Sequence, residues 1–127
     1  MPDKHVFEYA VLRVVPRVER EEFINVGVIV YCRGLGFLQT RYALPEARLR
    51  AFAAELDPQE LTERLRAFER ICQGRPEGGT IGQLTPAERF RWLTATRSTV
   101  VQTSPVHPGL CDDGPAMLAR LYAQLVE

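Results

Sequence analysis

Four residues of this chain have side chains suited to acid–base work on a phosphate-bearing substrate: Arg13, Glu22, Asn25 and His107. Arginine binds phosphate through paired hydrogen bonds, while glutamate and histidine transfer protons. His107 lies in a Pro/Gly segment, where catalytic bases are often found, but no serine or cysteine stands at a recognised nucleophile spacing from it. A small hydrolase or nuclease is therefore one hypothesis, and it requires these side chains to converge in one pocket.

Arg13 and Glu22 also belong to a wider charged group that includes Glu21 and Arg41. Because carboxylates stand right beside the arginines, we expect an internal network of ion pairs. Unpaired arginines would instead make an anion site. The adjacent carboxylates Glu21 and Glu22 diverge if they lie on a strand, so they are a weak signal for metal binding or acid–base work.

The run from Ile24 to Cys32 is strongly β-like and is interrupted by Asn25 and Gly27. A glycine inside a strand lets a ligand or another backbone approach closely, and Asn25 offers a donor and an acceptor. The structural alternative is a β-bulge at Gly27, with Asn25 bonded to the neighbouring connector. We favour the structural alternative.

A second group of candidates combines arginine with aromatic rings, as in sites that stack nucleic-acid bases. Its members are Arg89, Arg91 and Trp92. Phe90 and Leu93 occupy a core stripe on the same expected helix, so a structural role for Trp92 is the alternative. The net charge is zero, although arginine supplies all the basic residues except Lys4. Since nucleic-acid affinity comes mainly from positive charge, we expect no general nucleic-acid binding.

The composition is that of a soluble globular protein, with 46% hydrophobic and 25% charged residues. The 127 residues are enough for one domain, which we expect to span residues 1–127. The three scattered cysteines argue against disulfides and against a zinc site. No phosphate-binding glycine loop, dinucleotide fingerprint or zincin motif is present, so we expect no cofactor and no metal.

The first residues lack the apolar stretch of a secretion signal. The longest apolar run, Val26–Cys32, is too short to cross a bilayer. We therefore expect a cytoplasmic protein without a membrane partner.

The strands and helices that would position the candidates can be read from the hydrophobic pattern. Strands are expected at His5–Val15, Ile24–Cys32, Phe37–Tyr42 and Ser98–Ser104. Helices are expected after Leu44, from Asp57 to a stop at Gly74, from Thr85 through Leu93, and from Pro115. The segments Gly74–Leu84 and Pro105–Gly109 are expected to be irregular.

The resulting order, β-β-β-α-α-α-β-α, predicts an α+β fold with a four-stranded antiparallel sheet and helices mainly on one face. A three-residue loop between the second and third strands would pair Val30 with Leu38 and Val28 with Thr40. The valines would then face the helices. The second face would be open and half polar, with Asn25, Gly27, Ile29, Tyr31, Phe37, Gln39 and Arg41.

Several segments resemble the bacterial domain-of-unknown-function family 3037. They are Phe7–Arg13 with Pro16, Glu22–Val28, Glu88–Leu93, Val101–Ser104 and Leu121–Tyr122. The resemblance covers nearly the whole chain, and the Asn-Val-Gly-Val element is its most specific part. It implies a small stand-alone bacterial protein with no established activity. It also implies an accessory role, since relatives are expected to be encoded beside kinases of the persistence-toxin type.

The leading hypothesis is therefore a non-enzymatic protein that binds a protein partner, or a second copy of itself, through the open sheet face. The mixture of aromatic, amide and arginine side chains on that face is typical of an interface core. The binding residues would be Arg13, Glu22, Asn25, Gly27, Tyr31 and Arg41.

Overall fold

The structure is a computed structural model that describes residues 4–97 and 99–127. Its sheet contains β1 (His5–Val14), β2 (Ile24–Cys32), β3 (Phe37–Tyr42), β4 (Val101–Thr103) and β5 (His107–Cys111), all paired antiparallel. The order is β3-β2-β1-β4, and β5 pairs with the N-terminal part of β1 beside β4. The expected strand Ser98–Ser104 corresponds to β4, although Ser98 and the first three residues lie outside the described residues. β5 was not expected.

The helices are α1 (Glu46–Phe52), α2 (Pro58–Gln73), α3 (Gly79–Gly82), α4 (Pro86–Leu93) and α5 (Gly114–Leu125). Three-residue 3₁₀ turns lie at Val18–Arg20, Arg33–Leu35 and Pro76–Gly78. The start of α2 is capped by the Asp57 carboxylate, and α4 begins with a capping box between Thr85 and Glu88. The α+β class and the antiparallel sheet are confirmed, whereas the segment Gly74–Leu84 contains α3 and a 3₁₀ turn.

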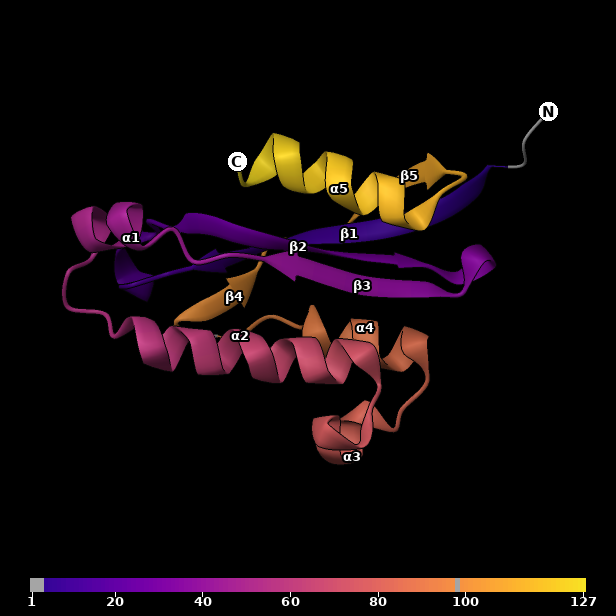
Figure 1. The fold of residues 1–127 in the computed structure, drawn as a ribbon, viewed down its shortest axis with the longest axis horizontal. Coiled ribbons are helices and arrows are strands. Elements are labelled where there is room, and N and C mark those ends of the chain that lie inside the picture. The colour runs from indigo at the N-terminus through magenta and orange to yellow at the C-terminus, as the bar shows by residue number, and fades with distance from the viewer. Residues whose placement is uncertain (1–3, 98) are drawn as a thin grey trace.

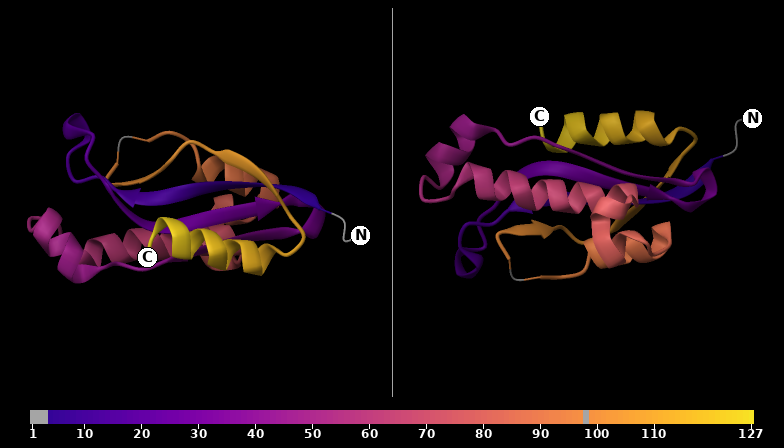
Figure 2. Two further views of the ribbon diagram at one scale, coloured as in Figure 1. Left: turned by 90° about the horizontal axis from the view of Figure 1, so that it is seen from above. Right: turned by 60° about the horizontal axis from the view of Figure 1, so that its bottom comes forward.

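Helices cover both faces of the sheet (Figure 1). One apolar cluster joins the sheet to α1, α2 and α4, and a second joins the opposite face to α5. Figure 2 shows α5 crossing β2 and β3. The expectation of an open, half-polar second face is therefore wrong: α2 and α4 cover Ile29 and Tyr31, and α5 covers the face of Val28 and Val30. Val26 and Val28 are both buried, but they belong to different clusters.

A β-bulge in β2 causes this division. Leu12 pairs with Gly27 while the next residue of β1, Arg13, pairs with Asn25, so Val26 is the additional residue. Asn25 thus lies on the α5 face with Arg13. Gly27, Ile29 and Tyr31 lie on the α2 face together with Val26. The expected bulge is present, but the additional residue is Val26 rather than Gly27, and Asn25 bonds to Leu125 of α5 rather than to the connector.

In the hairpin between β2 and β3, the pairing of the two strands is shifted by one residue from the expected register. Val30 pairs with Gln39, and Tyr31 pairs with Leu38. The predicted three-residue loop was wrong because Gly36 adopts a left-handed conformation (φ 60°) and adds a fourth residue to the connection. Leu38, Thr40 and Tyr42 therefore share the α2 face, and Gln39 and Arg41 share the α5 face.

Candidate functional site

Arg13 and Asn25 lie side by side under the C-terminal end of α5. The Asn25 amide donates to the carbonyl oxygen of Leu125 at 3.1 Å, and the Arg13 guanidinium lies 3.9 Å from the ring centroid of Phe23. Burial lowers the pKa of Arg13. Arg13 Nε and Asn25 Oδ1 are buried without a hydrogen-bond partner among the described residues. The hydrogen bond of Asn25 anchors the C-terminal end of α5 to the sheet.

The expected ion-pair network between the arginines and carboxylates near β1 is not formed. Within residues 4–97 and 99–127, neither Arg13 nor Arg41 is in an ion pair. Arg41 lies 4.4 Å from the ring centroid of Tyr122 in α5. Both arginines lie on the α5 face and stack on aromatic rings there, Arg13 on Phe23 and Arg41 on Tyr122.

Gly27 and Tyr31 are buried structural residues. A Cβ atom on Gly27 would lie 2.7 Å from both the Arg41 carbonyl oxygen and Tyr42 Cβ, so β3 approaches β2 too closely for a side chain. The Tyr31 ring stacks on Phe90 of α4 with 5.3 Å between centroids. Neither residue is available to a partner.

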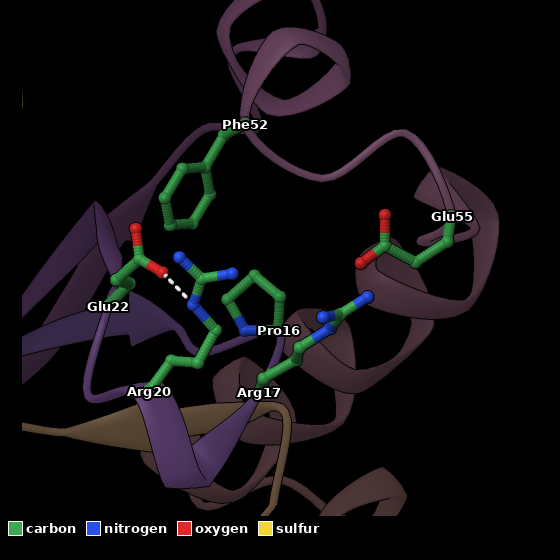
Figure 3. A pocket seen from close by; sticks show the side chains of 6 residues that line it. All are labelled: Pro16, Arg17, Arg20, Glu22, Phe52 and Glu55. Atoms are coloured by element: carbon green, nitrogen blue, oxygen red, sulfur yellow. Dashed lines mark ion pairs between the residues drawn. The ribbon is translucent and has the colours of Figure 1, made fainter.

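Glu22 lines a pocket of about 240 Å³ between the β1–β2 connector and the end of α1 (Figure 3). Its side chain pairs with Arg20 at 2.5 Å, and Figure 3 shows Arg17 extending toward Glu55. The pocket is completed by Pro16 and Phe52. The two arginines and two glutamates balance in charge, so the pocket has no electrostatic preference for an anion or a cation.

Arg89 is buried and holds the C-terminal end of α2. Its guanidinium donates to the carbonyl oxygens of Leu84, Ile71 and Cys72 at 3.0, 3.1 and 2.6 Å. The Ile71 carbonyl oxygen also accepts from the Gly74 N–H at 3.1 Å, and a cationic donor stabilises carbonyl groups at the C-terminal end of a helix. Arg89 is therefore not exposed to a nucleic acid.

Arg91 and Trp92 are also engaged within the protein. Arg91 forms a bidentate ion pair with Glu8 at 2.7 and 2.8 Å, which raises the pKa of Arg91. Trp92 is 40% exposed, with the Arg97 guanidinium 4.1 Å from its ring centroid. The expected base-stacking group therefore retains only Trp92 as a partly free surface.

His107 is remote from the other three residues of the hydrolase hypothesis. It pairs with Tyr9 of β1, whereas Asn25 pairs with Arg13 on the opposite side of β1. The positions of Tyr9 and Arg13 are four residues apart, or about 13 Å along the strand. Glu22 faces the separate pocket near α1. The four side chains do not converge.

A groove of about 410 Å³ runs between β3 and the C-terminal half of α2. Leu38, Gln39 and Thr40 line it from β3, although the side chains of consecutive strand residues point to opposite faces. The groove therefore follows the edge of the strand rather than either face. Its α2 side is formed by Glu69, Cys72, Gln73 and, just beyond the helix, Arg75.

β3 is an unpaired edge whose outward backbone groups can be assigned. The N–H of Ala43 points toward β2 and donates to the Val26 carbonyl oxygen at 2.9 Å. In an antiparallel pair every second residue bonds to the neighbouring strand, so the N–H and C=O groups of Arg41 and Gln39 also point toward β2. The same groups of Leu38, Thr40 and Tyr42 then point away from the sheet. Within the described residues, β3 pairs only with β2.

Arginines line the outer part of this region. A shallower pocket of about 290 Å³ adjoins the groove through their shared residues Glu69, Gln73 and Arg75, and it adds Arg66, Arg70 and Glu77. Three guanidinium groups thus face two carboxylates, and the Glu69 carboxylate accepts a hydrogen bond from the Tyr42 hydroxyl at 3.0 Å. The β3 groove, as we call the two pockets together, has a local excess of positive charge.

Neither the Cys72 thiol nor the Tyr42 hydroxyl at the β3 groove is suited to nucleophilic or acid–base catalysis near neutral pH. Burial raises the pKa of the Cys72 thiol to about 12, so the thiolate is absent at neutral pH. Burial, followed by the hydrogen bond to Glu69, raises the pKa of Tyr42. In the part of the chain that the structure describes, no three His, Cys, Asp or Glu side chains gather in a way that would hold a metal. The groove is suited to binding.

The sequence did not identify this groove. Two features of the sequence pointed toward the groove: β3 is the last strand before the helices, and Arg66 and Arg70 have the i, i+4 spacing that puts them on one side of α2. Neither signal shows that α2 returns along the edge of β3, which depends on the tertiary fold.

A family model described as "Protein of unknown function (DUF3037)" matches residues 9–126, nearly the whole chain. The chain belongs to this family. The resemblance inferred from the sequence is thereby confirmed, and the description of DUF3037 names no activity. No curated protein and no solved structure matches the chain. For this DUF3037 protein, no helix within residues 4–97 and 99–127 has the length and apolar character needed to pass through a bilayer.

Proposed function

We propose that this protein is a non-enzymatic interaction protein that binds an extended segment of a protein partner along the free edge of β3. The observation that carries the proposal is the outward orientation of the backbone groups of Leu38, Thr40 and Tyr42 beside a groove. An extended peptide that adds a strand to a sheet edge gains main-chain hydrogen bonds, and the neighbouring groove selects its side chains.

The other edge of the sheet is less suited to this role. β4 has three residues, and β5 contains Pro108, which lacks an N–H group. β3 has six residues and no proline. Long, flat edges are usually protected by charged side chains, but the one charged residue of β3, Arg41, stacks on Tyr122 across the opposite face.

A pair of proline variants tests the proposal. Thr40→Pro removes an N–H group that points away from the sheet, which an edge strand tolerates. Gln39→Pro removes an N–H group that points toward β2 and serves as the matched control for lost pairing. Urea unfolding should show that Thr40→Pro remains folded and that Gln39→Pro is much less stable.

Binding is then measured with a displayed library of random peptides. The wild-type protein should select peptides that add to β3, and folded Thr40→Pro should lose them. Selected peptides that bind Thr40→Pro as tightly as the wild type, or a library that yields no binder, would contradict the proposal. The family resemblance makes a kinase of the persistence-toxin type a natural partner to test with the same variants.

A further inference from the structure

We infer that the segment bound along β3 is acidic at every second residue, and that Arg66, Arg70 and Arg75 bind its carboxylates. This inference rests on the proposed function and specifies the chemistry of the partner. The juxtaposition that carries it is the outward backbone edge of β3 next to three guanidinium groups, two in the C-terminal half of α2 and one just beyond it.

The spacing of the acidic residues follows from the register. Leu38 and Tyr42 pack into the cluster on the α2 face, and Thr40 lies between them with the same orientation. A strand added to β3 places the residues opposite these three on that same face. Its alternate side chains would therefore point toward α2, and the intervening ones would point toward the α5 face.

The charges of the groove favour a carboxylate on those alternate positions. None of Arg66, Arg70 and Arg75 is in an ion pair among the described residues. Of the two carboxylates nearby, Glu69 is half-buried and bonded to the Tyr42 hydroxyl, which leaves Glu77 as the exposed one. Arginine binds carboxylates through two parallel hydrogen bonds, so the three guanidinium groups fit an acidic strand.

The same charges disfavour a second copy of this chain as the occupant. Antiparallel pairing of two β3 strands would bring the arginines of both copies to one shared edge, where like charges repel. The protein should therefore sediment as a monomer. A dimer that Thr40→Pro disrupts would contradict the inference.

The test compares soluble peptides of about eight residues, long enough to span β3. The first peptide alternates threonine with glutamate. In the second and third peptides, glutamine and lysine respectively replace the glutamates. The fourth peptide has the same composition as the first, but its threonines form one block and its glutamates another. Binding to the wild-type protein is measured by isothermal titration at low and high salt. The alternating glutamate peptide should bind about tenfold or more tighter than the others, with an affinity that falls as salt rises.

Arginine variants locate the interaction. Arg75→Gln and Arg70→Gln should each weaken the alternating glutamate peptide several-fold and leave the glutamine peptide unchanged. Arg64→Gln is the matched control. Arg64 also lies on α2, but it is outside the groove, where it forms an ion pair with Glu60 at 3.3 Å. Weakening by Arg64→Gln equal to that by Arg75→Gln would contradict the inference.

The outcomes separate the two proposals. Equal binding of the glutamate and glutamine peptides, with both lost in Thr40→Pro, would overturn the acidic specificity and leave strand addition in place. Binding of every peptide to Thr40→Pro as to the wild type, or binding of none to either, would overturn strand addition itself.

Discussion

Tyr31 of β2 stacks on Phe90 of α4, with 5.3 Å between ring centroids, in the middle of the cluster on the α2 face. A charged group at this position would be buried without a partner. We predict that Tyr31→Glu lowers the free energy of unfolding by more than about 3 kcal/mol. Tyr31→Phe keeps the ring stack and should change the free energy of unfolding little. Urea unfolding followed by circular dichroism measures both. A stable Tyr31→Glu protein would show that this face is open.

Gly27 allows β3 to approach β2 without a side chain between them. Gly27→Val would place atoms within 2.7 Å of the backbone of Arg41, so we predict a loss of stability of about 1–3 kcal/mol. The control is Gly36→Asn, because Gly36 has a positive φ and open space around it, and asparagine tolerates that conformation. Equal effects of the two substitutions in urea unfolding would contradict the close approach.

Arg89 satisfies three carbonyl oxygens at the junction of α2 and α4. Arg89→Met keeps much of the apolar stem but removes all three hydrogen bonds, so we predict a loss of about 2–4 kcal/mol. Arg91→Met removes the surface ion pair with Glu8 and a 5.3 Å contact of the guanidinium with the Phe90 ring, and should cost about 0–1 kcal/mol. If the thermal unfolding midpoints of both variants fell equally, Arg89 would not have this structural role.

The raised pKa of Cys72 predicts how stability depends on pH. Its value in the folded protein is about 12, compared with 9.0 for an ordinary thiol, because burial disfavours the thiolate. Above pH 9 the unfolded chain ionises and the folded protein does not, so stability falls between about pH 9 and 12. Tyr42 contributes in the same direction, since its pKa is also raised.

Replacing Cys72 by alanine isolates the contribution of the thiol. Cys72→Ala should be less stable at pH 8 because of the lost packing. Its stability should nevertheless fall less steeply between pH 9 and 11 than that of the wild type. If the stability of Cys72→Ala and of the wild type, measured by urea unfolding, fell equally steeply between pH 9 and 11, the folded protein would not protect the thiol from ionisation.

The fold class could be predicted because each element has strong local signals. The capping residues Asp57 and Thr85 mark the starts of α2 and α4, and both helices begin where these signals place them. The helix-covered second face could not be predicted, since the long connection from β3 to α5 does not show to which side α5 returns. The short strand β5 was hidden by Pro108 and Gly109, which are typical of turns.

The hairpin register shows where pattern reasoning reaches its limit. A buried face normally fixes the register, because a shift by one residue would expose the apolar side chains. Here both faces of β2 are buried, so apolar pairs form in either register. The four-residue connection that ends in the left-handed Gly36 decides it instead. The candidate binding residues were misplaced for the same reason, and the β3 groove depends on contacts between segments far apart in the chain.

The most direct test of binding along β3 is amide hydrogen exchange by NMR, with and without a peptide selected from the displayed library. In the free protein, the amides of Gln39 and Arg41 should be protected, and those of Leu38, Thr40 and Tyr42 should exchange quickly. The bound peptide should slow the exchange of the latter three. Fast exchange at these amides in the peptide complex would contradict the account.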